Sequence, residues 1–283
     1  MSATYSVLPN KRVSGKNGID YAYREMGSGQ VPLVLLQHFR GNLDSWDPEL
    51  IDALARSRQV ITFDNAWVGA TTGSTPNSVD QMAHDALSFL NAIEVDQFDV
   101  LGFSIGSFVA QEMALIRPDA VRRLVLASSA PRGARGMHGW SPEVIGLVGK
   151  RETSPDRYLK VFYTGSASSQ LAGQESLKRM FARKIDRDLP TTWETRLAQY
   201  DAVCDWGIPS HALLQRLSSI RVPVFVTNGD SDPMILPHYS HLLAGLIPQA
   251  SVKIYPDSAH GFLFQHHAEF AADVETFLDD PVR

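Results

Sequence analysis

The amino-acid sequence predicts an α/β fold in which a mostly parallel sheet carries helices on both of its faces. Short apolar runs without internal alternation recur between segments of helical periodicity along most of the 283 residues. Strands of that kind are buried on both faces, and strands that are joined through helices run parallel. The alternation stops between residues 132 and 216 and then resumes, which indicates a helical insertion in one sheet domain.

The elements before the insertion follow in regular order. We expect strands at residues 33–36, 60–63, 98–103 and 123–127, and helices at residues 46–55, 78–93 and 105–116. Ser78 and Gln81 have the spacing of a capping box, and the apolar residues after them recur with the 3.6-residue period of a helix. Pro118 ends the third helix near Arg117, because proline disfavours helical backbone in the residue before it.

The strand and helix pattern returns after the insertion. We expect strands at residues 222–227 and 251–255 and a closing helix at residues 270–278. The sheet domain then comprises residues 1–131 and 217–283, and residues 132–216 form a helical cap. The cap holds thirteen Lys and Arg against nine Asp and Glu. Two interpretations of this excess stay open: solvated charged faces, or a lid whose positive interior attracts an anionic substrate.

The composition argues against several classes of protein. A formal net charge of −5 and a pI of about 6.0 do not predict a nucleic-acid-binding surface. Cys204 is the single cysteine, which excludes an intramolecular disulfide framework. No apolar run approaches the ~20 residues that span a bilayer, and residues 1–15 lack the apolar core of a secretory signal. We therefore expect a cytoplasmic protein, alone or as a homodimer, whose partner is a small molecule and neither nucleic acid nor membrane.

The segment Gly102-Phe103-Ser104-Ile105-Gly106 places a serine between a predicted strand and a predicted helix. Gly-x-Ser-x-Gly at such a junction is typical of a nucleophile elbow, in which a strained turn exposes the serine hydroxyl. Glycines suit the flanking positions because they carry no Cβ. The amino end of the helix offers N–H groups and a positive dipole to an oxyanion. Ser104 is therefore the candidate nucleophile.

A serine nucleophile needs a base that removes its proton and a carboxylate that orients that base. Of the nine histidines, His260 is the candidate base, because it lies in the loop after the last predicted strand. The candidate carboxylate is Asp232, three residues beyond a glycine, whereas Asp230 is typical of a turn. His238 and His241 have the spacing of metal ligands on a helix, but no third ligand is evident. We therefore expect no metal and no cofactor.

The chain order serine, aspartate, histidine and the placement of the serine resemble the α/β-hydrolase superfamily over nearly the whole chain. The resemblance implies an eight-stranded, mostly parallel sheet with a helical cap. It also implies an oxyanion hole of two backbone amides, one after the nucleophile, at Ile105, and one after the third strand, at Phe39. His38 then occupies a position where the family usually has glycine. An alternative alignment pairs His38 with the family's histidine and Phe39 with its glycine.

Four side chains are candidates for substrate binding: His38, Arg40, Phe103 and Trp140. His38 and Arg40 lie near the expected pocket mouth. They either bind a carboxylate or carbonyl of the substrate, or hold the oxyanion loop in place by hydrogen bonds. The aromatic content of the cap favours an apolar or aromatic substrate, although a helical cap also needs aromatic side chains for its own packing.

The leading hypothesis is a serine hydrolase that cleaves a carboxylic ester, lactone or related acyl bond through an acyl-enzyme on Ser104. One alternative within the superfamily is carbon–carbon bond hydrolysis of diketone-like compounds. A second alternative, from a different class, is a non-hydrolytic small-molecule binder on the same scaffold. Epoxide and haloalkane chemistry is disfavoured, because those relatives place an aspartate where this chain has Ser104.

Overall fold

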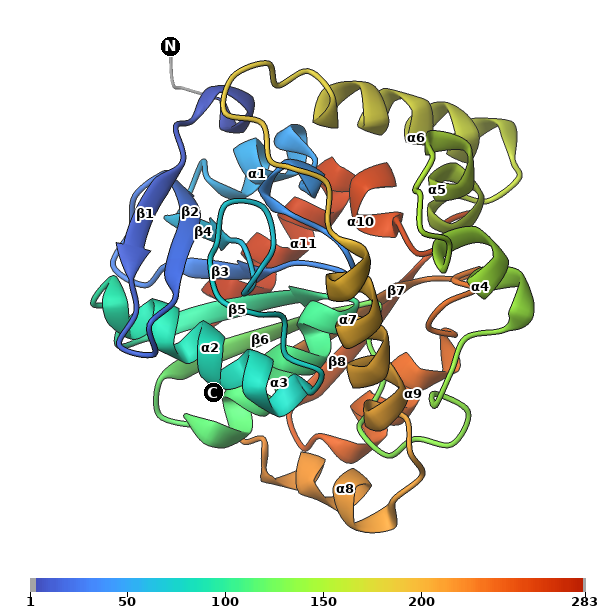
Figure 1. The fold of residues 1–283 in the computed structure, drawn as a ribbon. Coiled ribbons are helices and arrows are strands. Elements are labelled where there is room, and N and C mark those ends of the chain that lie inside the picture. Colours follow the sequence, from blue (N-terminus) through green and yellow to red (C-terminus); the bar gives the residue numbers. More distant parts are fainter. Residues whose placement is uncertain (1–3, 282–283) are drawn as a thin grey trace.

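The computed structural model describes residues 4–281 and has an eight-stranded sheet at its centre (Figure 1). The strands are β1 Lys11–Ser14, β2 Asp20–Met26, β3 Leu33–Leu36, β4 Val60–Phe63, β5 Phe98–Phe103, β6 Val121–Ala127, β7 Val224–Gly229 and β8 Ala250–Tyr255. They lie in the order β1-β2-β4-β3-β5-β6-β7-β8. β1 pairs antiparallel with β2, and β2 pairs antiparallel with β4. The other six strands, β4, β3, β5, β6, β7 and β8, run parallel to one another. The expected fold class is confirmed.

Helices cover both faces of the sheet. Outside the insertion they are α1 Pro48–Leu54, α2 Val79–Ala92, α3 Ile105–Ile116, α9 His238–Leu246, α10 Phe262–Gln265 and α11 His267–Asp279. α2 packs beside α3, and α1 packs beside α11. Figure 1 shows these two pairs on opposite sides of the sheet. Every residue of β3, β4 and β5 is buried, as continuously apolar strands require.

Local contacts explain where two elements begin. The Ser78 hydroxyl accepts a hydrogen bond from the Gln81 N–H at 3.3 Å and so caps α2 as the spacing predicts. The Gln81 side chain donates to Asp85 instead of the Ser78 backbone, so the expected capping box is only half formed. β7 begins at Val224, two residues later than expected, because Pro223 has no N–H to donate to the sheet.

Residues 132–216 contain five helices: α4 Pro142–Val148, α5 Pro155–Phe162, α6 Ala167–Met180, α7 Trp193–Trp206 and α8 His211–Gln215. This insertion leaves the sheet at the carboxyl end of β6. α6 packs against α1 and α10, and α7 packs against α2. The insertion is therefore anchored to helices of the sheet domain. Within residues 4–281, no helix is long and apolar enough to span a lipid bilayer.

Candidate active site

Ser104 occupies the tight turn between β5 and α3. Its backbone has φ 57° and ψ −125°, a combination that a residue with a side chain adopts only under strain. The Ser104 N–H donates to the Ala127 carbonyl on β6 at 2.9 Å, which fixes the turn against the sheet. The Ser104 hydroxyl does not cap α3. The turn therefore has the geometry of a nucleophile elbow, and its buried hydroxyl is not committed to the helix.

The glycines of the elbow are required by close backbone packing. A Cβ on Gly106 would collide with the Leu36 carbonyl at the end of β3. A Cβ on Gly102 would collide with the backbone of Gly106 and Ser107 in the first turn of α3. The Gly-x-Ser-x-Gly pattern thus lets α3 begin directly against β3 and β5, and this places the amino end of α3 beneath Ser104.

Asp232 and His260 form the second part of the site. His260 lies in the loop between β8 and α10, and its Nδ1 is 2.8 Å from Asp232 Oδ2. The other carboxylate oxygen of Asp232 accepts the N–H groups of Met234 at 2.8 Å and Ile235 at 3.0 Å. Both side chains are buried. With its Nδ1 proton held by the carboxylate, the imidazole presents Nε2 as a proton acceptor.

Ser104, Asp232 and His260 follow the carboxyl ends of β5, β7 and β8, which lie at one edge of the sheet. The ring of Phe103 lies 5.1 Å from that of His260, so the elbow and the histidine loop pack together. In the described residues, no hydrogen bond yet joins the Ser104 hydroxyl to His260. Such bonds are often long in enzymes without substrate and shorten in the complex.

Two backbone N–H groups are free beside the elbow. Within residues 4–281, neither the Phe39 amide nor the Ile105 amide donates a hydrogen bond to another residue. The Ile105 amide is at the first position of α3, where the helix itself provides no acceptor. The Phe39 N–H shares a peptide group with the His38 carbonyl. That carbonyl accepts a hydrogen bond from the Gly41 N–H at 2.9 Å. Both amides are thus available for an oxyanion.

The peptide after Phe39 is clamped on both sides. The Phe39 carbonyl lies 2.9 Å from His38 Nδ1. The Arg40 N–H, at the other side of the same peptide group, donates to Gln199 Oε1 at 2.7 Å. Arg40 itself has φ 62°, a left-handed backbone that the clamp stabilises. Gln199 comes from α7, so the insertion holds the loop that carries the Phe39 amide.

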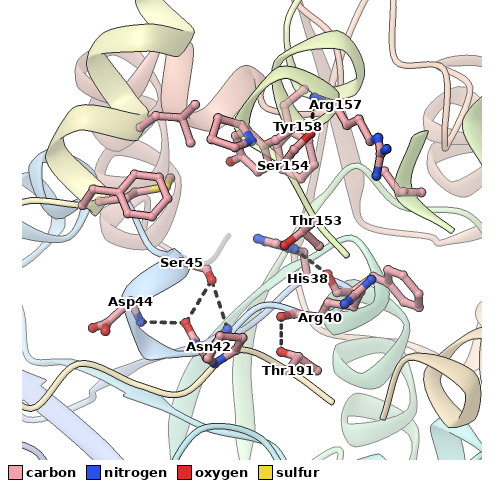
Figure 2. Close-up of a pocket in the computed structure, with 18 of the residues that line it drawn as sticks. His38, Arg40, Asn42, Asp44, Ser45, Thr153, Ser154, Arg157, Tyr158 and Thr191 are labelled. Atoms are coloured by element: carbon pink, nitrogen blue, oxygen red, sulfur yellow. Dashed lines mark hydrogen bonds between the residues drawn. The ribbon is translucent and has the colours of Figure 1, made fainter. Parts of the chain in front are cut away.

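The guanidinium of Arg40 also binds the insertion. It donates to the carbonyls of Lys150 at 2.8 Å and Arg151 at 3.1 Å. The Arg40 carbonyl in turn accepts from the Thr191 hydroxyl (Figure 2). These contacts match the structural interpretation of Arg40, in which it holds the oxyanion loop in place.

A cavity of about 360 Å³ lies between the sheet domain and the insertion. His38, Phe39, Arg40 and His260 form its inner wall, and Figure 2 shows His38 beside Thr153 and Arg40 in that wall. The apolar part of the lining is Phe39, Leu147, Val148, Pro155, Tyr158, Phe162, Leu177, Met180, Phe181, Pro190 and Met234. The charged part includes Arg40, Arg157, Arg187, Asp44 and Asp188, so the interior is not uniformly positive.

Two of the four expected substrate contacts do not line this cavity. Phe103 is fully buried and packs against the rings of His38 and Phe162. Trp140 packs on Phe39 at 4.9 Å between ring centres, behind the oxyanion loop. Their large rings serve as packing for the site, whereas His38 and Arg40 reach the cavity. Within residues 4–281, no three His, Cys, Asp or Glu side chains gather as a metal site.

The structure adds residues that sequence reasoning missed. The His260 and Gly261 amides donate to the Val161 and Phe162 carbonyls of α5 at 3.4 and 2.8 Å. Gln199 holds the oxyanion loop from α7. No local pattern marks these positions, because each acts through a contact between segments far apart in the chain. The insertion therefore contacts both the loop of His260 and the loop that carries the Phe39 amide.

The sheet order, the strained serine turn and the Asp232–His260 pair together define an α/β-hydrolase. The model of the alpha/beta hydrolase fold family matches residues 31–267, and the chain belongs to this family. It is an enzyme of the hydrolase class, as the family resemblance of its sequence implies.

Proteins of known structure and known name are similar over most of the chain. An alpha/beta hydrolase fold protein from Chitinophaga pinensis is 36% identical with a TM-score of 0.92, covering 98% of this chain and 100% of that one. Est816, described as an N-acyl homoserine lactone degrading enzyme, is 26% identical with a TM-score of 0.75, covering 94% and 100%. The pimeloyl-[acyl-carrier protein] methyl ester esterase of Aliivibrio salmonicida is 25% identical, covering 87% and 91%.

Proposed function

We propose that the protein is a serine hydrolase that cleaves a carboxylic ester or lactone through an acyl-enzyme on Ser104. One observation carries the proposal: a strained serine with an uncommitted hydroxyl shares a sheet edge with a buried Asp232–His260 pair and two free amides. Each of these features lowers the free energy of unfolding of a protein. Together they provide the nucleophile, the base and the oxyanion donors that acyl transfer needs.

In this proposal Ser104 Oγ attacks the substrate carbonyl while His260 Nε2 takes its proton. Asp232 keeps the imidazole in the required tautomer and stabilises it when it becomes charged. The Phe39 and Ile105 amides bind the oxyanion, a contribution of about 3 kcal/mol per donor in comparable enzymes. His260 then protonates the leaving alcohol, and water activated by the same histidine releases the acid.

The cavity supports a small, largely apolar substrate. Seven of the eleven apolar side chains that line the cavity come from α4, α5 and α6 of the insertion. We propose that residues 132–216 act as a cap that excludes bulk water and selects the substrate. The Aliivibrio esterase and Est816 favour ester and lactone bonds among the acyl compounds considered. A small-molecule partner and a cytoplasmic location stay part of the proposal.

A fluorophosphonate probe tests the nucleophile. The purified protein should be labelled rapidly on Ser104, labelling should vanish in Ser104→Ala, and it should slow strongly in His260→Ala. Circular dichroism of each variant confirms that it is folded. Absence of labelling on the folded wild type would favour a non-hydrolytic binding protein.

A substrate panel then identifies the bond that is cleaved. We expect p-nitrophenyl esters and lactones to be hydrolysed with higher kcat/KM than vinylogous diketones. The reverse order would assign the site to carbon–carbon bond hydrolysis and would contradict the proposed substrate class.

A further inference from the structure

The ring of His38 is fixed in one orientation and one tautomer. Its Nδ1 lies 2.9 Å from the Phe39 carbonyl, which can only accept, so Nδ1 carries the proton. The rings of Phe103 and Phe162 lie edge-on to it, each with centres 5.3 Å away. Because Nδ1 faces the protein's own backbone, the outer edge of the ring, with Nε2, faces away from that backbone.

Burial keeps this imidazole neutral. His38 is 7% exposed. Loss of solvent lowers its pKa to about 3; the Phe39 carbonyl opposes this shift in part, and nearby His260 adds to it. His38 is therefore uncharged across the range in which a hydrolase works, and Nε2 keeps its lone pair throughout.

Nε2 of His38 has no hydrogen-bond partner among the described residues, although it is buried. A buried acceptor without a partner is costly, and an apolar side chain would fill the space between the two phenylalanines without that cost. The acceptor is therefore available to a donor that arrives with the substrate.

The position of His38 indicates which part of the substrate carries this donor. His38 lines the cavity together with Phe39, whose amide is the oxyanion donor, and with His260, the base. A carbonyl bound to the Phe39 amide brings one of its two substituents, the acyl carbon or the ester oxygen, beside His38, the residue before Phe39 in the chain. Of these two substituents, only the carbon can carry an O–H or N–H donor.

We propose that His38 Nε2 accepts a hydrogen bond from an O–H or N–H group on the carbon next to the scissile carbonyl. The enzyme then prefers α-hydroxy or α-acylamino lactones and esters over α-alkyl ones. This inference rests on the proposed hydrolase function and names the substrate class of the same site.

The test compares three lactones of one ring size: α-hydroxy-, α-acetamido- and α-methyl-γ-butyrolactone. Hydrolysis gives kcat/KM, and protection of Ser104 from fluorophosphonate labelling gives binding even for a lactone that is not turned over. The wild type should favour one or both donor-bearing lactones by about 10- to 100-fold. The hydroxy and acetamido compounds distinguish an O–H donor from an N–H donor.

Two variants separate acceptor from packing. His38→Asn places an amide N–H where Nδ1 lies, so it retains the bond to Phe39 but removes the outer acceptor; its preference ratio should fall to near one. His38→Gln reaches further and retains an acceptor, so part of the preference should return. His241→Asn, on the exposed face of α9, is the matched control and should keep the full ratio.

Equal treatment of all three lactones by the wild type would overturn the inference, and so would a full preference in His38→Asn. If Ser104 is still labelled in either case, only the role of His38 fails. Loss of labelling in the folded wild type would instead reject the proposed function itself.

Discussion

Two aspartates that lie two residues apart after β7 make different contacts. Asp232 holds the ring of His260. The Asp230 carboxylate accepts the amides of Asp257 at 3.0 Å and Ser258 at 3.3 Å, which belong to the loop that leads to His260. One carboxylate therefore orients the ring of His260, and the other shapes the loop that carries it.

Asp232→Asn should lower kcat by about 10⁴-fold, because the amide no longer stabilises the required tautomer and the charged imidazole. Asp230→Asn should lower it less than tenfold, since one oxygen still accepts from the loop. Steady-state kinetics on one p-nitrophenyl ester measures both. A larger loss in Asp230→Asn would show that the orienting carboxylate is assigned to the wrong residue.

At this scale the sequence predicts the residues whose roles follow from local pattern and chain order. Ser104 is marked by its glycines, and Asp232 and His260 by their loops after strands. The Asp232–His260 contact is present in the structure. The sequence also predicts substrate contacts for Phe103 and Trp140, but neither lines the cavity, because both rings pack against residues from distant segments that the sequence does not place.

At the scale of elements, the packing of α3 against the sheet depends on Gly106. The backbone of β3 passes directly over this position, at the Leu36 and Gln37 carbonyls. Gly245 in α9 differs, because a Cβ there would meet nothing within 4 Å. A side chain is therefore excluded at Gly106 and has room at Gly245.

Gly106→Ala should lower the free energy of unfolding by about 1–3 kcal/mol, since the added methyl group forces backbone apart. Gly245→Ala should raise it by up to about 1 kcal/mol, because alanine loses less conformational entropy in a helix. Urea unfolding followed by circular dichroism measures both changes. Equal effects at the two positions would contradict the close approach of α3 and β3.

The sequence predicts the parallel strands and the long core helices well, because their apolar periodicity is strong. It gives element ends less well: α11 begins at His267, not at residue 270. For residues 132–216 the sequence predicts only a helical region and not the separate short helices. Helices of this length are stabilised mainly by tertiary contacts, which leave little periodic signal in the sequence.

At the scale of the whole molecule, the insertion meets the sheet domain at an acidic pair, of which Asp64 is buried and Asp188 is half-buried. Asp64 follows β4, and Asp188 lies between α6 and α7. A Cβ on Gly69 would touch the carboxyl groups of both, which places the two side by side. One oxygen of each is buried without a hydrogen-bond partner in residues 4–281, so no donor stabilises the negative charge there.

Burial raises the pKa of Asp188 to about 6, and nearby Asp44 adds to the effect; Arg24 and Arg183 oppose it. Burial and Asp188 together raise the pKa of Asp64 well above its usual value. The folded state thus holds protons that the unfolded state has already lost. Stability from this pair is present at low pH, declines as the pH rises from about 4 through about 6 where Asp188 ionises, and declines further where Asp64 ionises.

Asp188→Asn should therefore stabilise the protein above pH 6 and flatten the dependence of Tm on pH between 4 and 7. The asparagine amide can donate to Asp64 without ionising. Thermal unfolding at a series of pH values measures this, and Asp96→Asn, at an exposed position, is the control that should leave the curve unchanged. A curve for Asp188→Asn identical to that of the wild type would contradict the raised pKa of this pair.

Trapping the covalent intermediate tests most directly whether Ser104 is the nucleophile. The enzyme is mixed with an excess of p-nitrophenyl ester, quenched in acid within milliseconds, digested, and mapped by mass spectrometry. We expect the acyl group on the peptide that contains Ser104, in parallel with a burst of p-nitrophenol. Steady turnover with an adduct on a different residue, or turnover that persists in Ser104→Ala, would contradict the assignment of the nucleophile.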